Sequence, residues 1–109
     1  MRADDRNRIK HMRDAAKEAY SFTRGKTRKD LDKNRMLVLA VLKDLEILGE
    51  AANKVSAETQ EEHDNIPWGD IIGMRNRLIH GYFDIDLDII WKTISEDIPT
   101  LLKALEKIV

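Results

Sequence analysis

Apolar residues recur along the chain at the three- and four-residue spacing of helices, and no stretch shows the alternation of a β-strand. The pattern predicts a first amphipathic helix from about Asp4 to Phe22, which ends at Gly25. The predicted buried face of this helix consists of Ile9, Met12, Ala16, Ala19 and Thr23.

A second, more apolar helix is predicted from about Leu31 to Val55, after a polar joint with the capping candidates Thr27 and Asp30. Its main apolar stripe consists of Leu37, Val41, Leu45, Leu48, Ala52 and Val55. Other apolar side chains lie on other faces, so this helix has two surfaces to bury; they include Met36, Leu39 and Ile47. In a chain of this size, the second surface predicts contact with a partner subunit.

The polar stretch 56–65 is predicted to be a short helical turn or a loop. A third helix is predicted from about Pro67 to Ile79 or His80. Proline suits the first helical position because its missing N–H would have no partner there. Gly81 is a natural residue for the end of this helix.

A fourth helix is predicted to start after a cap at Asp84 or Asp86. Pro99 lies inside its pattern and should kink or split it near Glu96. Its predicted buried side consists of Leu87, Ile90, Ile94, Leu101, Leu105 and Ile108. These elements predict an all-α fold, a bundle of four to five helices in a single domain over residues 1–109.

Composition narrows the possible functions. The 109 residues include 19 basic and 20 acidic side chains, so the net charge of −1 gives no global attraction for nucleic acid. Any contact with RNA must therefore come from a local basic patch. The absence of cysteine excludes disulfides, thiolate metal sites and cysteine nucleophiles. No secretory signal or membrane span is apparent, so we expect a soluble, cytoplasmic protein without membrane contact.

The segment from Arg75 to Tyr82 holds the densest set of reactive groups. On a continuous helix, Asn76 and His80 would share one face, and the long side chain of Arg75 would reach the same patch. A histidine transfers protons near neutral pH, and a guanidinium binds phosphate and stabilises developing negative charge. This set suits cleavage of an RNA phosphodiester bond. It lacks a second acid–base group, which a symmetric dimer would supply by placing two such segments opposite each other.

A structural interpretation of the same residues is also open. Cations and a histidine near the end of a helix often complement the helix dipole and have no chemical role. Spacing alone favours this structural interpretation, because an R-x-x-x-x-H match is a weak signal.

The segment 75–82 resembles the R-x-x-x-x-H-x-Y signature of HEPN-domain toxins, and most closely that of the HepT-like family of HEPN/MNT toxin–antitoxin systems. Further blocks resemble this family in the same order along the chain. They are LEILGEAAN (45–53), NIPW (65–68), IIGMRN (71–76), FDID (83–86), Trp91 and EDIP (96–99).

The resemblance implies a homodimeric HEPN-type bundle that cleaves RNA without a metal or other cofactor. Arg75 and His80 would be the catalytic pair, and Asn76 would support them. Tyr82 matches the tyrosine that the partner antitoxin, an MNT-type nucleotidyltransferase, modifies with AMP. The added bulk and negative charge would oppose entry of an RNA phosphate. Gly81 departs from the expected larger residue and leaves the placement of the Tyr82 phenol open.

Three further residues are candidates for the dimer cleft. Glu46 and Glu50 lie one helical turn apart, which fits either a role in the cleft or a solvated edge with a salt bridge. Arg77 is predicted to steer phosphate or contact a partner. The alternative function is a non-catalytic helical module that docks a nucleotidyltransferase and presents Tyr82 or the basic cluster to it.

Overall fold

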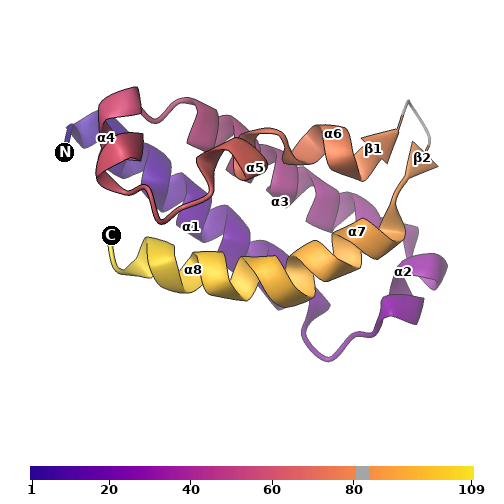
Figure 1. Cartoon of the computed structure of the whole chain (residues 1–109). Coiled ribbons are helices and arrows are strands. Elements are labelled where there is room, and N and C mark those ends of the chain that lie inside the picture. The colour runs from indigo at the N-terminus through magenta and orange to yellow at the C-terminus, as the bar shows by residue number, and fades with distance from the viewer. Residues whose placement is uncertain (81–83) are drawn as a thin grey trace.

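Two long antiparallel helices form the centre of the fold (Figure 1). The computed structural model describes residues 1–80 and 84–109, and of His80 only the backbone. The two long helices are α1, which spans Ala3–Thr23, and α3, which spans Arg35–Asn53. The predicted apolar face of α1 is buried, and it packs along α3. Beyond α1, Gly25 has a φ of 74°, a left-handed conformation that favours glycine. The first predicted helix is therefore confirmed.

The second predicted helix starts later than expected because the chain breaks at Asn34. Residues before it form the short helix α2 (Arg28–Lys33), where the N–H of Thr27 donates to the carboxylate of Asp30 at 2.6 Å. Asn34 has an extended conformation, and its side-chain oxygen accepts a hydrogen bond from the N–H of Leu37 at 3.0 Å. A good N-cap residue thus starts a new helix where periodicity predicted continuity.

The polar stretch after α3 contains the short helix α4 (Ala57–Glu62), as expected. It is tied to α1 by Asp5, whose carboxylate accepts hydrogen bonds from the N–H and hydroxyl of Ser56 and the hydroxyl of Thr59. These donors stabilise the charged form and lower the pKa of Asp5 to about 2. The buried carboxylate of Asp5 is therefore fully satisfied.

The third predicted helix is shorter than expected and is interrupted. It consists of α5 (Trp68–Ile72) and α6 (Met74–Leu78), separated at Gly73. The prediction that it continues to Ile79 or His80 is wrong: β1 (Ile79–His80) pairs antiparallel with β2 (Asp84–Ile85). β-Branched Ile79 and Ile85 face each other in this pair, which suits an extended backbone better than a helix.

The C-terminal part forms one curved rod in Figure 1, made of α7 (Leu87–Lys92), a π-helical turn η1 (Thr93–Asp97) and α8 (Ile98–Glu106). Asp86 caps α7 by accepting from the N–H of Ile89 at 3.1 Å. Pro99 lies in the first turn of α8, immediately after the π turn. The predicted disturbance near Glu96 is thus present as a widened turn, since proline has no N–H to donate.

Together these elements confirm an all-α bundle, to which the structure adds one pair of two-residue strands. The rod α7–η1–α8 covers one side of the α1–α3 pair, while α5 and α6 lie along α3 (Figure 1). Within the described ranges, no helix is both long and apolar enough to cross a membrane.

One face of α3 is not covered by any other part of the chain that the structure describes. Met36 is 82% exposed and Leu39 is 45% exposed, while Lys43 and Glu50 are exposed and Ile47 is half-buried. We call these five residues the α3 ridge, because their spacing of three and four places them along one side of the helix. The predicted second surface of this helix is therefore present and open.

Candidate functional site

Arg75 lies at a small cleft between α3 and the α5–α6 segment. The cleft has a volume of about 150 Å³, and we call it the Arg75 cleft. It is lined by Leu45, Glu46, Gly49, Glu50, Asn53, Ile72 and Arg75. Both predicted carboxylates and the predicted catalytic arginine therefore line one cleft, although they are far apart in the sequence.

An ion pair connects two of these side chains. The Nε of Arg75 lies 3.4 Å from Oε1 of Glu46. Glu46 is the more buried partner, with a side-chain exposure of 22% against 63% for Arg75. The carboxylate is therefore held on α3 and contacts one edge of a guanidinium that extends into solvent. Glu46 contacts Arg75 through Nε, and the remaining Nη groups can donate further hydrogen bonds.

Gly49 allows the two walls of this cleft to approach closely. A Cβ built at position 49 would lie 3.1 Å from the carbonyl oxygen of Ile71, which is tighter than ordinary van der Waals contact. A side chain at position 49 would therefore require the backbone of α5 to move away from α3 by a few tenths of an ångström. This contact sets the distance between Glu46 and the short helix that carries Arg75.

His80 and Asn76 do not share a helical face, since α6 ends at Leu78. Asn76 is exposed on α6, whereas His80 lies in β1 opposite Asp84 of β2. The backbone N–H of Asp86 donates to the carbonyl of Leu78 at 2.8 Å and fixes the point where the helix becomes extended. The prediction that Asn76 and His80 share one face of a continuous helix is therefore wrong.

Tyr82 and Gly81 lie outside the described residues. The roles predicted for Tyr82 and for the side chain of His80 stay predictions. The β1–β2 pairing nevertheless places the backbone of His80 two residues beyond α6 and joins it to the start of α7.

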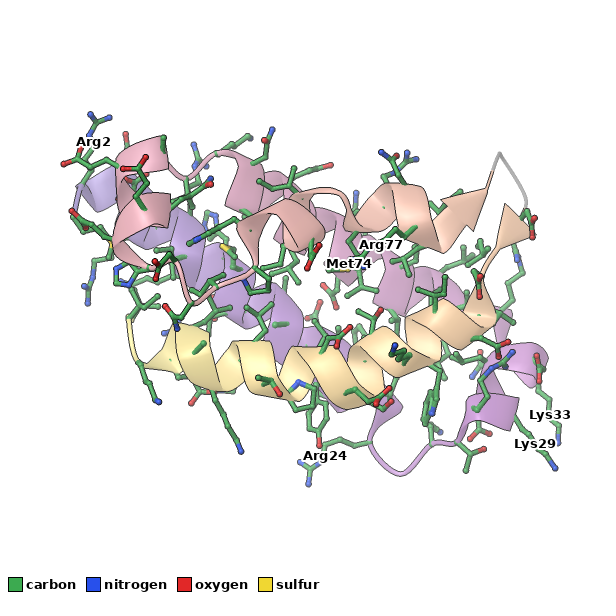
Figure 2. All side chains as sticks on the ribbon, in the orientation of Figure 1. Arg2, Arg24, Lys29, Lys33, Met74 and Arg77 are labelled. Carbon is green, nitrogen blue, oxygen red and sulfur yellow. The ribbon has the colours of Figure 1, made fainter. Side chains whose placement is uncertain are left out.

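Arg77 lies on a different side of α6 from the Arg75 cleft. Figure 2 shows Arg77 and Met74 on the side of α6 that faces the C-terminal rod. Arg77 donates through Nη2 to the carbonyl oxygen of Asp70 at 2.9 Å and lines a separate pocket of about 270 Å³ with Glu96 and Asp97. The structure thus separates Arg77 from Arg75, and the two cations do not form one basic strip in this chain.

Four lining residues of the Arg75 cleft were not predicted as site residues: Leu45, Gly49, Asn53 and Ile72. Asn53 lies three residues after Glu50, which itself lies four residues after Glu46, so the three share one face of α3. Helical spacing could therefore have predicted Asn53 as a lining residue. Ile72 lies on another element, and only tertiary packing brings it there. Among the described residues, no group of three or more His, Asp or Glu side chains is arranged to hold a metal ion.

The sequence matches a known family over most of its length. The family model described as "Ribonuclease HepT-like" matches residues 12–108. The chain belongs to this family. No solved structure matches it.

Relatives of the chain also carry ribonuclease names. A protein of Thermococcus cleftensis named "Probable ribonuclease HepT" is 33% identical over 99% of this chain and 98% of its own length. A protein of Methanocaldococcus jannaschii named as a putative RNase is 37% identical over 85% of each chain. Another so named, from Caldanaerobacter subterraneus subsp. tengcongensis, is 36% identical over 92% of this chain and 89% of its own length. The resemblance inferred from the motif blocks is therefore confirmed at the level of the family.

Proposed function

We propose that this HepT-like protein cleaves RNA without a metal ion, as the toxin of a HEPN/MNT toxin–antitoxin pair, and acts as a homodimer. The observation that supports this proposal best is the Arg75 cleft, where the half-buried carboxylate of Glu46 contacts the guanidinium of Arg75, the arginine of the R-x-x-x-x-H motif. Family membership makes RNA the expected substrate.

In this mechanism Arg75 binds the scissile phosphate and stabilises the negative charge that develops on its oxygens. In the composite site, one His80 takes the proton from the attacking ribose 2′-hydroxyl, and the His80 of the second copy donates a proton to the leaving 5′-oxygen. Asn76, exposed beside Arg75, supports the pair by orienting the imidazole or a ribose hydroxyl. Glu46 acts through Arg75 and is a positioning residue.

Homodimerisation would supply the second acid–base group that one chain lacks. The uncovered α3 ridge lies beside the Arg75 cleft, since Glu50 belongs to both. A two-fold contact over this ridge would bring two Arg75 clefts close together. Burial of Met36 and Leu39 would contribute to association, because both are large apolar side chains exposed in the single chain.

The function is tested by assaying the purified protein on RNA in the presence of a chelator. His80→Ala should lower cleavage at least about 100-fold, the usual contribution of a general acid–base group. Circular dichroism and sedimentation should show an unchanged fold and oligomeric state. Undiminished cleavage by the variant would exclude His80 as the catalyst, and a wild-type protein without cleavage would favour the non-catalytic docking module.

Silencing by AMP transfer to Tyr82 is a separate part of the proposal. Incubation with the partner nucleotidyltransferase and ATP should add the mass of AMP to a peptide that contains Tyr82, and cleavage should fall. The Tyr82→Phe protein should resist both effects because it lacks the acceptor hydroxyl. Tyr20, exposed on α1, provides the matched control as Tyr20→Phe. Full labelling of the Tyr82→Phe protein would refute this assignment.

A further inference from the structure

Asp44 on α3 is a buried acid whose surroundings provide too few donors. It is 4% exposed, and its Oδ2 has no hydrogen-bond partner among the described residues. The other buried acid, Asp5, accepts three hydrogen bonds. An unsatisfied buried carboxylate is costly, so the environment of Asp44 requires an explanation.

Asp44 opens into a shallow cleft of about 240 Å³ between α1 and α3, which we call the acidic cleft. It is lined by His11, Asp14, Ala15 and Glu18 from α1 and by Asp44 and Ile47 from α3. Burial, together with the hydrogen-bonded and negatively charged neighbour Glu18, raises the pKa of Asp44 to about 7. With a pKa of about 7, Asp44 holds a proton up to near-neutral pH when nothing else is bound.

The group that would replace this proton is a cation. No set of His, Asp and Glu within the described ranges is arranged to hold a metal ion, so a side-chain ammonium or guanidinium is the better candidate. Such a group would donate hydrogen bonds to both carboxylates and compensate their charge.

The α3 ridge borders the acidic cleft, since Ile47 belongs to both. The ridge also carries a suitable cation. Lys43 precedes Asp44, is exposed, and forms no ion pair in the part of the chain that the structure describes. It is flanked by the exposed apolar residues Met36 and Leu39 on one side and by Ile47 on the other. α3 has no other cation apart from Arg35 at its first position.

We propose that Lys43 of a second copy of this chain inserts its ammonium group into the acidic cleft and binds Asp44 and Glu18. A two-fold contact over the α3 ridge would form this interaction twice, once in each direction. The inference rests on the homodimer of the proposed function and assigns its contacts. A proton and the ammonium group compete for the same carboxylates, so acidification weakens the dimer.

The test measures the dimer dissociation constant by analytical ultracentrifugation at about pH 8 and at about pH 5.5, which lie on either side of the pKa of Asp44. RNA cleavage is measured on the same samples. The wild-type dimer should weaken at least about 10-fold at the lower pH, which corresponds to about 1.4 kcal/mol. Asp44→Asn and Lys43→Gln should each weaken it similarly at the higher pH and remove most of the pH dependence. The double variant should be no weaker than either single variant.

Controls separate this contact from other causes. Glu61→Gln, an exposed acid on α4, should leave the dissociation constant unchanged. His11 also lines the acidic cleft, and His11→Gln should retain the pH dependence. Asp44→Asn should fold at least as well as wild type, because it removes a buried charge. The folded-state pKa near 7 lies above the ordinary 3.8, so this carboxyl reduces stability as pH rises from about 4 to 7.

The proposal is overturned by a dimer whose dissociation constant is unaffected by Asp44→Asn or Lys43→Gln. It is also overturned if His11→Gln alone removes the pH dependence. Either result leaves the ribonuclease proposal intact, provided that dimeric wild type still cleaves RNA. A protein that cleaves RNA as a monomer would overturn both this contact and the composite site, but not the activity.

Discussion

At the scale of single residues, the contact between Arg75 and Glu46 is the central feature. Because Arg75 is 63% exposed, an ion pair of this kind contributes little to stability, on the order of 0–1 kcal/mol. Its effect is on orientation: Nε is held at 3.4 Å from the carboxylate, and the opposite edge of the guanidinium points away from it. A lysine at position 75 would have no equivalent second edge.

Substitution of Glu46 tests this role. Glu46→Ala should lower kcat for RNA cleavage about 10-fold, because a misplaced binding group is costly, while the melting temperature should change little. Glu46→Gln should recover most of the activity, since its amide oxygen still accepts from Nε. Glu50→Ala, on the same cleft wall, is the matched control and should have a smaller effect. Equal activities for Glu46→Ala and wild type would contradict the role.

At the scale of elements, the short helices α5 and α6 position the candidate site. Neither is long enough to be stable alone, and both depend on packing against α3. Their close approach at Gly49 and the break at Gly73 determine where Arg75 lies relative to Glu46. α6 ends at Leu78, and the chain continues directly into the strand β1, which contains His80.

Two glycine substitutions separate the effect of close packing on stability from the effect of helix propensity. Gly49→Ala should destabilise the protein by roughly 1–3 kcal/mol, since its Cβ would press on the backbone carbonyl of Ile71 and displace α5. Cleavage should fall as the Arg75 cleft widens. Gly69→Ala, in α5 with open space around the added Cβ, should instead stabilise by about 0.5–1 kcal/mol. Thermal unfolding measures both, and stabilisation by Gly49→Ala would contradict the close packing.

At the scale of the whole molecule, the bundle leaves one long helix open along one side. Three surfaces adjoin there: the α3 ridge, the Arg75 cleft on one flank and the acidic cleft on the other. A partner that covers the ridge would therefore contact both clefts. If the proposed dimer forms over the ridge, dimerisation and activity would depend on the same helix.

A double substitution on the ridge tests this dependence. Met36→Glu with Leu39→Glu should give a monomer of unchanged helix content, because both side chains are exposed in the single chain. Its RNA cleavage should fall at least about 10-fold, since the composite site loses its second half. Sedimentation tests whether the variant is a monomer, and circular dichroism tests whether its helix content is unchanged. Full cleavage by a folded monomer would show that one chain is sufficient.

The amino-acid sequence by itself determined the helical class, the buried faces of the helices and the family, and it narrowed two caps to the pairs Thr27 or Asp30 and Asp84 or Asp86. These are local or repeated signals: apolar spacing, capping side chains and motif blocks in order. Periodicity could not show the breaks at Asn34 and Gly73 or the end of α6 at Leu78, because short-range hydrogen bonds override it there.

Only the tertiary structure decided which side chains meet. Glu46 and Arg75 are 29 residues apart in the chain, and their contact depends on how α6 packs against α3. The same packing turned Arg77 to the opposite side of α6. Packing of α1 against α3 buried the carboxyl of Asp44 beside the ridge and left its Oδ2 without a hydrogen-bond partner among the described residues. The physical reason is that helical spacing defines the faces of one helix, whereas a site between helices depends on how closely, and at which residues, those faces approach each other.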